Sequence, residues 1–173
     1  EISAGAGVGT NGGSFAITVA KNKSKYREDS QLVNWLLKKE DIHNYNSYKT
    51  HLNFFQNVKK HKILLKELLL NLKDMGKKII GYGASTKGNV MLQYCNINSD
   101  ILDVVVDVNK EKYNRYTPGS NIKIVGESAI DSIQPDYMVV MPWHFKNFII
   151  KKERKYLANN GKLIFPLPDI EIL

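Results

Sequence analysis

Residues 81–90 read GYGASTKGNV and combine two closely spaced glycines with two hydroxyl side chains and a lysine. Glycine lets a chain turn tightly and brings backbone amides close to a ligand, and the start of a helix offers unpaired N–H groups to an anion. Ser85, Thr86 and Lys87 would add further donors at the same place. The stretch is therefore a candidate binding site for a phosphate or a nucleotide.

Two standard nucleotide motifs fit this stretch incompletely. A dinucleotide-binding turn would have its third glycine where this chain has Thr86, and Gly88 comes two residues late. A Walker motif would need lysine and then serine or threonine directly after Gly88, where the chain has Asn89 and Val90. A strand–helix turn whose glycines serve only packing is the alternative, and the sequence leaves both interpretations open.

Three further groups follow expected strands. Asp107 lies where dinucleotide folds place a ribose-binding acid, although an acid that caps the turn before Asn109 is an equally good explanation. Residues 116–120, Tyr-Thr-Pro-Gly-Ser, form a turn with two hydroxyls. Trp143 could stack on a base or seal the edge of a sheet, and no neighbour of His144 in sequence indicates a catalytic triad.

The segment from residue 77 onward alternates apolar runs with helical patterns. Strands are predicted at residues 78–82, 101–107, 122–125, 136–141 and 162–165, and helices at 85–94, 127–133 and 145–158. Apolar strands separated by helices indicate a mostly parallel sheet covered on both faces. The predicted fold is therefore α/β, a Rossmann-like three-layer sandwich. Ligands of such sheets bind beyond the carboxyl ends of the strands, where the loops 81–87, 107–120, 142–146 and 166–169 would lie.

The chain before this segment has a different pattern. Residues 1–22 hold a glycine-rich opening and then a β-branched and aromatic run that predicts a strand. Residues 23–76 are helical, with a short helix near 30–39 and a long one near 47–75 whose apolar residues recur every three, four or seven positions. We expect this helical segment to pack on the α/β domain of residues 77–173.

Composition and charge make several kinds of partner and site unexpected for this chain. The net charge is +8, but short lysine runs at helical spacing are typical of solvated helix faces, so nucleic acid is not an expected partner. The single cysteine, Cys95, permits no internal disulfide and no thiolate metal site, and no other cluster has metal spacing. Neither a membrane helix of about 20 apolar residues nor a signal peptide is visible, so we expect a cytoplasmic protein without a membrane partner.

Four stretches of the chain, taken in order, resemble one protein family. They read GYGASTKGNVMLQYCNI, VVDVNKEKYNRYTPGSNI, PDYMVVMPWHFK and NGKLIFPLP. Together they resemble the C-terminal domain of S-adenosylmethionine-dependent sugar C-methyltransferases, which methylate nucleotide-linked, typically dTDP-linked, keto-deoxysugars. Residues 11–14 and the strand after them resemble the end of that family's methyltransferase domain.

The resemblance implies an enzyme of three parts. These are a zinc-binding N-terminal module, a middle domain that binds S-adenosylmethionine and supplies the acid/base residues, and a Rossmann-like domain that closes over the nucleotide sugar. Residues 1–10, EISAGAGVGT, resemble a methyl-donor glycine motif only superficially, because no apolar strand leads in and no helix leads out. We therefore expect this chain to be the third part, a fragment that neither binds the methyl donor nor turns over alone.

The resemblance also indicates site residues at matching positions. Those expected to approach the diphosphate or sugar, to line the crevice or to form its wall are Tyr82, Gly83, Ala84, Lys87, Asn89, Thr117, Pro118, Gly119, Ser120 and Trp143. Ser85 and Asp107 complete the candidate substrate-binding set, and no residue is assigned as a catalytic base. After Ser120 the family more often has His-Ile-Pro-Ile, whereas residues 121–124 are Asn-Ile-Lys-Ile, so the sugar stays unassigned.

The sequence is compatible with three functions. The first is a substrate-binding domain of a sugar C-methyltransferase, which positions the acceptor and excludes water. The alternative is a free-standing Rossmann-type dinucleotide-binding domain of an oxidoreductase, and titration with NAD(H) and with dTDP separates these two. The third is a non-catalytic domain whose basic helices dock another protein, for which Lys87→Ala and Trp143→Ala would leave every ligand response unchanged.

Overall fold

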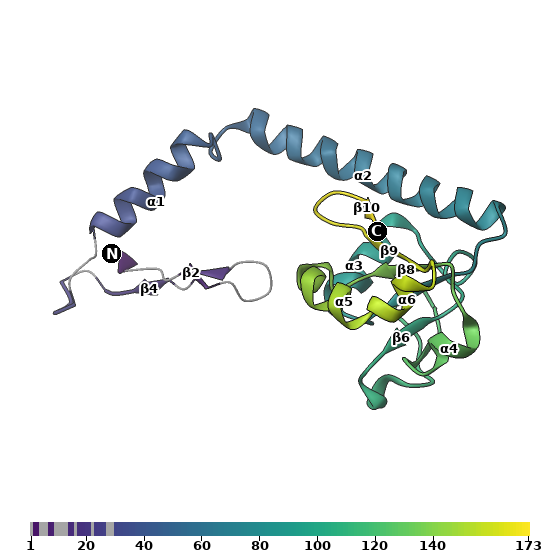
Figure 1. Ribbon diagram of the computed structural model, residues 1–173. Helices are drawn as coiled ribbons and strands as arrows, with labels where there is room; N and C mark the ends of the chain where they lie inside the picture. Colours follow the sequence, from purple (N-terminus) through teal and green to yellow (C-terminus); the bar gives the residue numbers. More distant parts are fainter. Residues whose placement is uncertain (1, 4–6, 9–13, 16, 22, 27–29) are drawn as a thin grey trace. The chain divides into compact units, whose positions relative to one another are not determined.

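The structure is a computed structural model that describes residues 2–3, 7–8, 14–15, 17–21, 23–26 and 30–173 (Figure 1). The chain divides into two compact units, Glu1–Asn57 and Val58–Leu173. All of the candidate site residues lie in the second unit. Within the described residues, no helix is both long enough and apolar enough to cross a membrane.

The first unit contains paired strands of two residues each. β1 (Ile2–Ser3) pairs antiparallel with β4 (Thr18–Val19), and β2 (Gly7–Val8) pairs antiparallel with β3 (Ser14–Phe15). The run that predicted one strand therefore contributes β3 and β4, and Ala16 between them lies outside the described residues. The glycine-rich opening, residues 1–13, is described only at β1 and β2.

Two helices follow, α1 (Ser30–Ile42) and α2 (Tyr48–Asp74). The buried residues of α2 recur every four and three positions and belong to the core of the second unit: Leu65, Leu69 and Leu72. Gly76 ends this helix with a φ of +72°. The N–H of Gly76 donates to the Lys73 carbonyl and that of Lys77 to the Leu72 carbonyl, which is a Schellman motif.

The second unit is built on a six-stranded sheet in the order β10-β9-β8-β5-β6-β7. Its members are β5 (Ile79–Tyr82), β6 (Val105–Asp107), β7 (Ile124–Gly126), β8 (Tyr137–Val140), β9 (Lys162–Phe165) and β10 (Glu171–Ile172). β5 to β9 are parallel, and β10 runs antiparallel at the edge. The predicted α/β, Rossmann-like sandwich with a mostly parallel sheet is confirmed.

Helices cover both faces of this sheet, and Figure 1 shows α5 and α6 together on one side of it. One core layer packs α2 and α3 (Thr86–Cys95) against alternate strand residues such as Ile79, and the other packs α4, α5 and α6 against the intervening ones such as Ile80. The bounds of these three helices are Ala129–Ile133, Lys146–Lys152 and Arg154–Ala158. Two 3-10 helices, η2 (Lys110–Lys112) and η3 (Trp143–Phe145), lie in the connections.

Two predicted elements were wrong in extent. The strand predicted at 101–107 begins only at Val105, because Ile101 and Leu102 form a turn in which the N–H of Leu102 donates to the Asn98 carbonyl. The helix predicted at 145–158 is divided among η3, α5 and α6. The interruption lies at Glu153, where α5 ends and α6 begins.

The strand order places a topological switch point at the centre of the sheet. From β5 the chain moves to β6 and β7 on one side, and it then returns to β8 on the other side. Connections therefore leave β5 and β8 in opposite directions, which opens a crevice beyond their carboxyl ends in folds of this kind. The turns after β5 and β8 therefore lie at the switch point.

Candidate functional site

The turn between β5 and α3 is fixed by its own residues. Gly83 has a φ of +82°, a region that residues with a side chain rarely adopt. A Cβ on Gly83 would also lie 2.8 Å from Cδ of Pro142, in the turn after β8. Ser85 then caps α3, because its Oγ accepts a hydrogen bond of 3.0 Å from the Gly88 N–H. Local sequence therefore sets where α3 begins.

The other two glycines serve close packing. A Cβ on Gly88 would lie 2.5 Å from Cβ of Met141, and one on Gly81 would lie 2.9 Å from Cγ2 of Val105. The packing interpretation accounts for these two positions. Since Gly88 lies in the first turn of α3 and Met141 directly follows β8, that first turn rests on the carboxyl end of β8.

Asp107 ties the glycine turn to the loop after β6. The residue is buried, with 6% of its surface exposed. Oδ2 accepts from the Ala84 N–H at 2.7 Å and from Lys112 Nζ at 3.0 Å, and Oδ1 accepts from the Asn109 N–H at 2.7 Å. Lys112 also donates to the Ala84 carbonyl at 3.0 Å. These contacts agree with the turn-capping interpretation, and a ribose contact for Asp107 stays a prediction.

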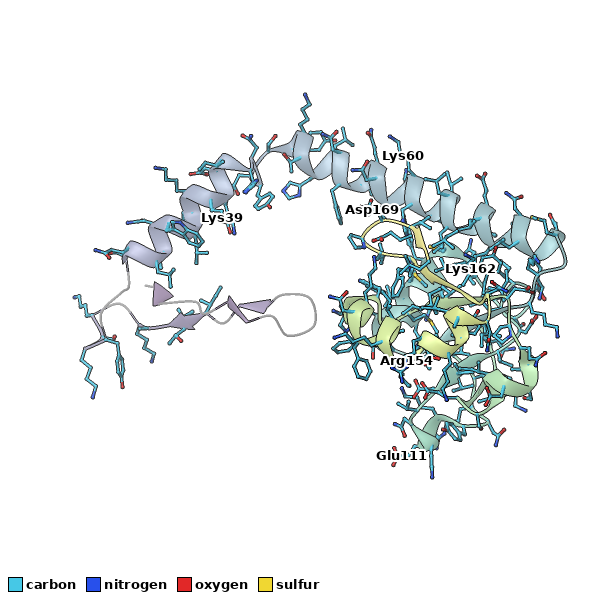
Figure 2. The ribbon with its side chains drawn as sticks, viewed as in Figure 1. Lys39, Lys60, Glu111, Arg154, Lys162 and Asp169 are labelled. Carbon is cyan, nitrogen blue, oxygen red and sulfur yellow. The ribbon has the colours of Figure 1, made fainter. Side chains whose placement is uncertain are left out.

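The same loop reaches outward before it returns to β7. Figure 2 shows Glu111, in η2, at the outer tip of this loop. Thr117 and Ser120 are buried, with their hydroxyls 2.7 Å apart, and Thr117 Oγ1 accepts from the Ile122 N–H at 2.9 Å. Both hydroxyls therefore stabilise residues 117–122, the part of the loop that leads back to β7 (the returning segment), through hydrogen bonds inside it.

This returning segment also contacts α3. Gln93 Nε2 donates to the Pro118 carbonyl at 2.8 Å, and Gly119 has a φ of +73°. A Cβ on Gly119 would lie 2.7 Å from Cδ of Gln93. Pro118 and Gly119 themselves are exposed, so they form the surface of the segment.

The turn after β8 brings an aromatic group and a histidine to the switch point. Trp143 is partly buried against the second core layer, and its ring lies edge-on to that of His144 at 6.0 Å. The His144 ring lies 4.3 Å from that of Phe145. Burial is the main cause that lowers the pKa of His144, and the positive charge of Lys87 lowers it further. The two residues belong to different elements, Lys87 to α3 and His144 to η3.

Two polar atoms of this region are buried without a hydrogen-bond partner among the described residues, namely Asn89 Oδ1 and His144 Nδ1. Native proteins pair nearly all buried polar atoms, so each such atom needs an explanation. Asn89 is the fourth residue of α3, and its N–H donates to the Ser85 carbonyl at 2.9 Å. His144 was considered from sequence only as part of a triad, and its buried Nδ1 was not foreseen.

Tyr82 ends β5, but its side chain lies in the second core layer, only 4% exposed. Its hydroxyl donates to Glu153 Oε1 at 2.7 Å; burial first, and then this hydrogen bond, raise the pKa of Tyr82. Lys152 Nζ lies 5.4 Å from the centre of the Tyr82 ring and 2.6 Å from Glu127 Oε1. Sequence reasoning missed this cluster, since no motif links residues so far apart.

The last predicted loop, residues 166–169, lies between β9 and β10. Figure 2 shows Asp169 there, on the side of the unit that α2 covers. Burial lowers the pKa of His61, which lies in α2, and the negative charge of Asp169 opposes that effect. In the part of the chain that the structure describes, no group of three or more histidines, cysteines or acids could hold a metal ion.

The structure thus places two of the predicted segments against α3, whereas the Tyr82 side chain and the Thr117 and Ser120 hydroxyls are buried elsewhere. The turn after β8 contacts α3 through Met141, and the loop after β6 contacts its neighbourhood through Asp107 and Pro118. The first turn of α3, which holds Lys87, and the turn after β8, which leads to Trp143, thus lie against each other. A helix N-terminus, a lysine and a tryptophan ring can together bind an anion that is linked to an aromatic base.

Comparison with known proteins gives two findings. A family described as "C-methyltransferase C-terminal domain" matches residues 9–168. C-methyltransferase NovU of Streptomyces niveus is 30% identical over 109 residues, which cover 63% of this chain and 26% of that protein. The chain thus matches about a quarter of the length of this relative.

Proposed function

This chain belongs to the family of C-methyltransferase C-terminal domains, and we propose that it binds the nucleotide-linked sugar on which such an enzyme acts. The ligand class is a keto-deoxysugar carried on a nucleoside diphosphate, typically dTDP. The full enzyme would act in cytoplasmic deoxysugar biosynthesis. Methyl transfer itself would take place in a middle domain that is not part of this chain.

The position of Lys87 carries this proposal. It lies in the first turn of α3, which rests on the carboxyl end of β8 at the switch point of the sheet. A lysine beside a helix N-terminus favours a phosphate group, because both supply positive potential and N–H donors. We therefore assign the diphosphate to this corner, bounded by Gly83, Ala84 and Ser85.

The remaining site residues would bind the two ends of the ligand. Trp143 offers an aromatic surface at the end of β8, which suits a base or the apolar face of a sugar. Pro118 and Gly119 are exposed, and the backbone of Gly119 would offer hydrogen-bond partners to a polar sugar. Four other predicted residues would support the site without contacting the ligand, because their polar groups already form hydrogen bonds within the protein. They are Tyr82, Asp107, Thr117 and Ser120.

Binding in this manner would contribute to the reaction by positioning. A ligand held at both ends presents one sugar carbon in a fixed orientation, and closure of the site excludes water. S-adenosylmethionine would supply the methyl group in the full enzyme, and we place no residue of this chain on it.

We extend the proposal to the domain boundaries. Residues 1–22 would complete the preceding methyltransferase domain, residues 23–76 would form the helical segment, and residues 77–173 would form the substrate-binding domain. A zinc-binding module would precede them all.

Isothermal titration of the chain with dTDP-glucose and with NAD(H) tests this function. We expect dTDP-glucose to bind, and we expect Lys87→Ala to weaken the binding by about tenfold or more, since a hydrogen bond to a charged group contributes about 1.5–3 kcal/mol. Lys155→Ala, in the exposed part of α6, is the matched control and should bind like the unmodified chain. Tight NAD(H) binding without a response to dTDP-glucose would instead support the oxidoreductase alternative.

A further inference from the structure

A buried negative charge lies directly beside the place that the proposed function gives to the diphosphate. Oδ2 of Asp107 accepts from the N–H of Ala84 at 2.7 Å, and Ala84 is one of the three residues that bound this corner. The Asp107 side chain is only 7% exposed, so water screens its charge poorly. Taken alone, this carboxylate would repel an anion at the start of α3.

Lys112 brings a positive charge to the same residue, Ala84. Its Nζ atom lies 3.0 Å from Asp107 Oδ2 and 3.0 Å from the Ala84 carbonyl oxygen. The Lys112 side chain is 38% exposed, so the lysine is the solvent-facing member of the pair. A lysine carries three N–H donors, and among the described residues two of those of Lys112 have an acceptor. The third is available to a ligand.

The fold and the ligand depend on different properties of this lysine. For the fold, the backbone N–H groups of Ala84 and Asn109 already bind the carboxylate, and an ion pair with a partly exposed member adds little. For an anion at the same corner, the summed charge of the pair decides. Without Lys112 the ligand would meet an uncompensated carboxylate, whereas with Lys112 the pair is neutral and the start of α3 still contributes positive potential.

We infer that Lys112 is a binding residue of the nucleotide-sugar site: it neutralises Asp107 and offers its third N–H to a phosphate oxygen. Asp107 then serves as the anchor that fixes the ammonium group beside Ala84. No bond of the ligand is broken, and no proton is transferred. This inference rests on the proposed function and deepens it, because it adds the cation that lets a diphosphate with two negative charges lie next to a buried carboxylate.

Isothermal titration with dTDP-glucose compares variants that change the charge with variants that keep it. We expect Lys112→Met to weaken binding by about tenfold or more, because the ligand would then meet the carboxylate without its cation. Lys112→Arg keeps the positive charge and should bind within about threefold of the unmodified chain. Lys110→Met removes an exposed lysine of the same 3-10 helix, and it should bind like the unmodified chain.

Asp107→Asn separates the electrostatic role from a structural one. Asparagine removes the negative charge and keeps one oxygen as an acceptor for the Ala84 N–H. In the otherwise unmodified chain, this change should tighten the binding of dTDP-glucose by about threefold to tenfold. In the Lys112→Met background it should restore most of the lost affinity. A purely structural role of the pair, or a ribose contact of Asp107, predicts the opposite, since each change would then weaken binding further.

The outcomes separate this inference from the function on which it rests. The role of Lys112 would be overturned, with the proposed function left standing, by Lys112→Met that binds like the unmodified chain, by Asp107→Asn that leaves binding equal or weaker, or by a double variant that recovers no affinity. If circular dichroism shows that Lys112→Met does not fold, Asp107→Asn alone decides the question. An unmodified chain that does not bind dTDP-glucose would overturn the proposed function and this inference with it.

Discussion

Replacing Asp107 by alanine should strongly destabilise the second unit, because its carboxylate connects the glycine turn to the loop after β6. The buried N–H of Ala84 would lose its acceptor, and a hydrogen bond to a charged group contributes about 1.5–3 kcal/mol. Asn109 is an exposed residue, so its N–H can bond to water instead and the loss of this hydrogen bond costs about 1 kcal/mol. Lys112 is 38% exposed, so its ion pair adds at most about 1 kcal/mol. We therefore expect Asp107→Ala to lower the free energy of unfolding by about 3 kcal/mol.

Urea denaturation followed by circular dichroism measures this effect. Lys112→Met is the matched variant, because it keeps the carboxylate with both of its backbone donors and removes only the contacts of Lys112, which are the ion pair and the hydrogen bond to the Ala84 carbonyl. It should cost about 1–2 kcal/mol. The reasoning is refuted if Asp107→Ala unfolds at the same urea concentration as the unmodified chain, or if Lys112→Met is equally destabilising.

Three further changes test other parts of the structure. Gly83→Ala should lower the free energy of unfolding by about 1–2 kcal/mol or more in urea denaturation, because alanine is strained at positive φ and its Cβ would meet the turn after β8; unchanged stability would contradict this conformation. Tyr82→Phe should cost about 1–2 kcal/mol through the lost hydrogen bond to Glu153, whereas Tyr116→Phe, at an exposed site, should cost little. Burial is the larger of two effects on the pKa of His61, and it lowers this pKa in the folded chain. As the pH falls, the His61 imidazole therefore takes up a proton more readily in the unfolded chain, and the free energy of unfolding should fall as the pH drops below about 6.5. His61→Gln should reduce this dependence, and an unchanged pH profile would show that another group causes it.

The sheet could be predicted because its strands are nearly continuous apolar runs. β5, β8 and β9 lie within one or two residues of the predicted positions. The helix predicted at 85–94 is Thr86–Cys95, since Ser85 is a side-chain cap that the sequence displays directly. Elements that are determined by neighbouring residues, such as these strands and this helix start, could therefore be predicted from the sequence.

Apolar runs were misleading where burial does not require a strand. Ile101 and Leu102 are buried in a turn, so their side chains gave the same signal as β6. β10 was missed because it has two exposed residues and pairs only at the sheet edge. The break at Glu153 was also missed, because helical periodicity continues across it.

The candidate site was only partly visible, because its contacts join distant residues. The sequence identified the glycine turn and the tryptophan as separate features, and the strand order brings them to one corner. The hydrogen bond between Tyr82 and Glu153 spans 71 residues, and that between Ala84 and Asp107 spans 23. No short-range pattern encodes such pairs, so which side chains hold the turns could not be predicted.

Tryptophan fluorescence tests most directly whether the nucleotide sugar binds at the switch point. The chain has two tryptophans, Trp35 in α1 and Trp143 in η3, so Trp35→Phe leaves Trp143 as the only source of the signal. We predict that dTDP-glucose changes this emission in a saturable manner, and that Lys87→Ala shifts the titration to higher ligand concentration. Saturable binding of dTDP-glucose in calorimetry, with unchanged Trp143 emission and no effect of Lys87→Ala, would contradict the assignment of this corner as the site.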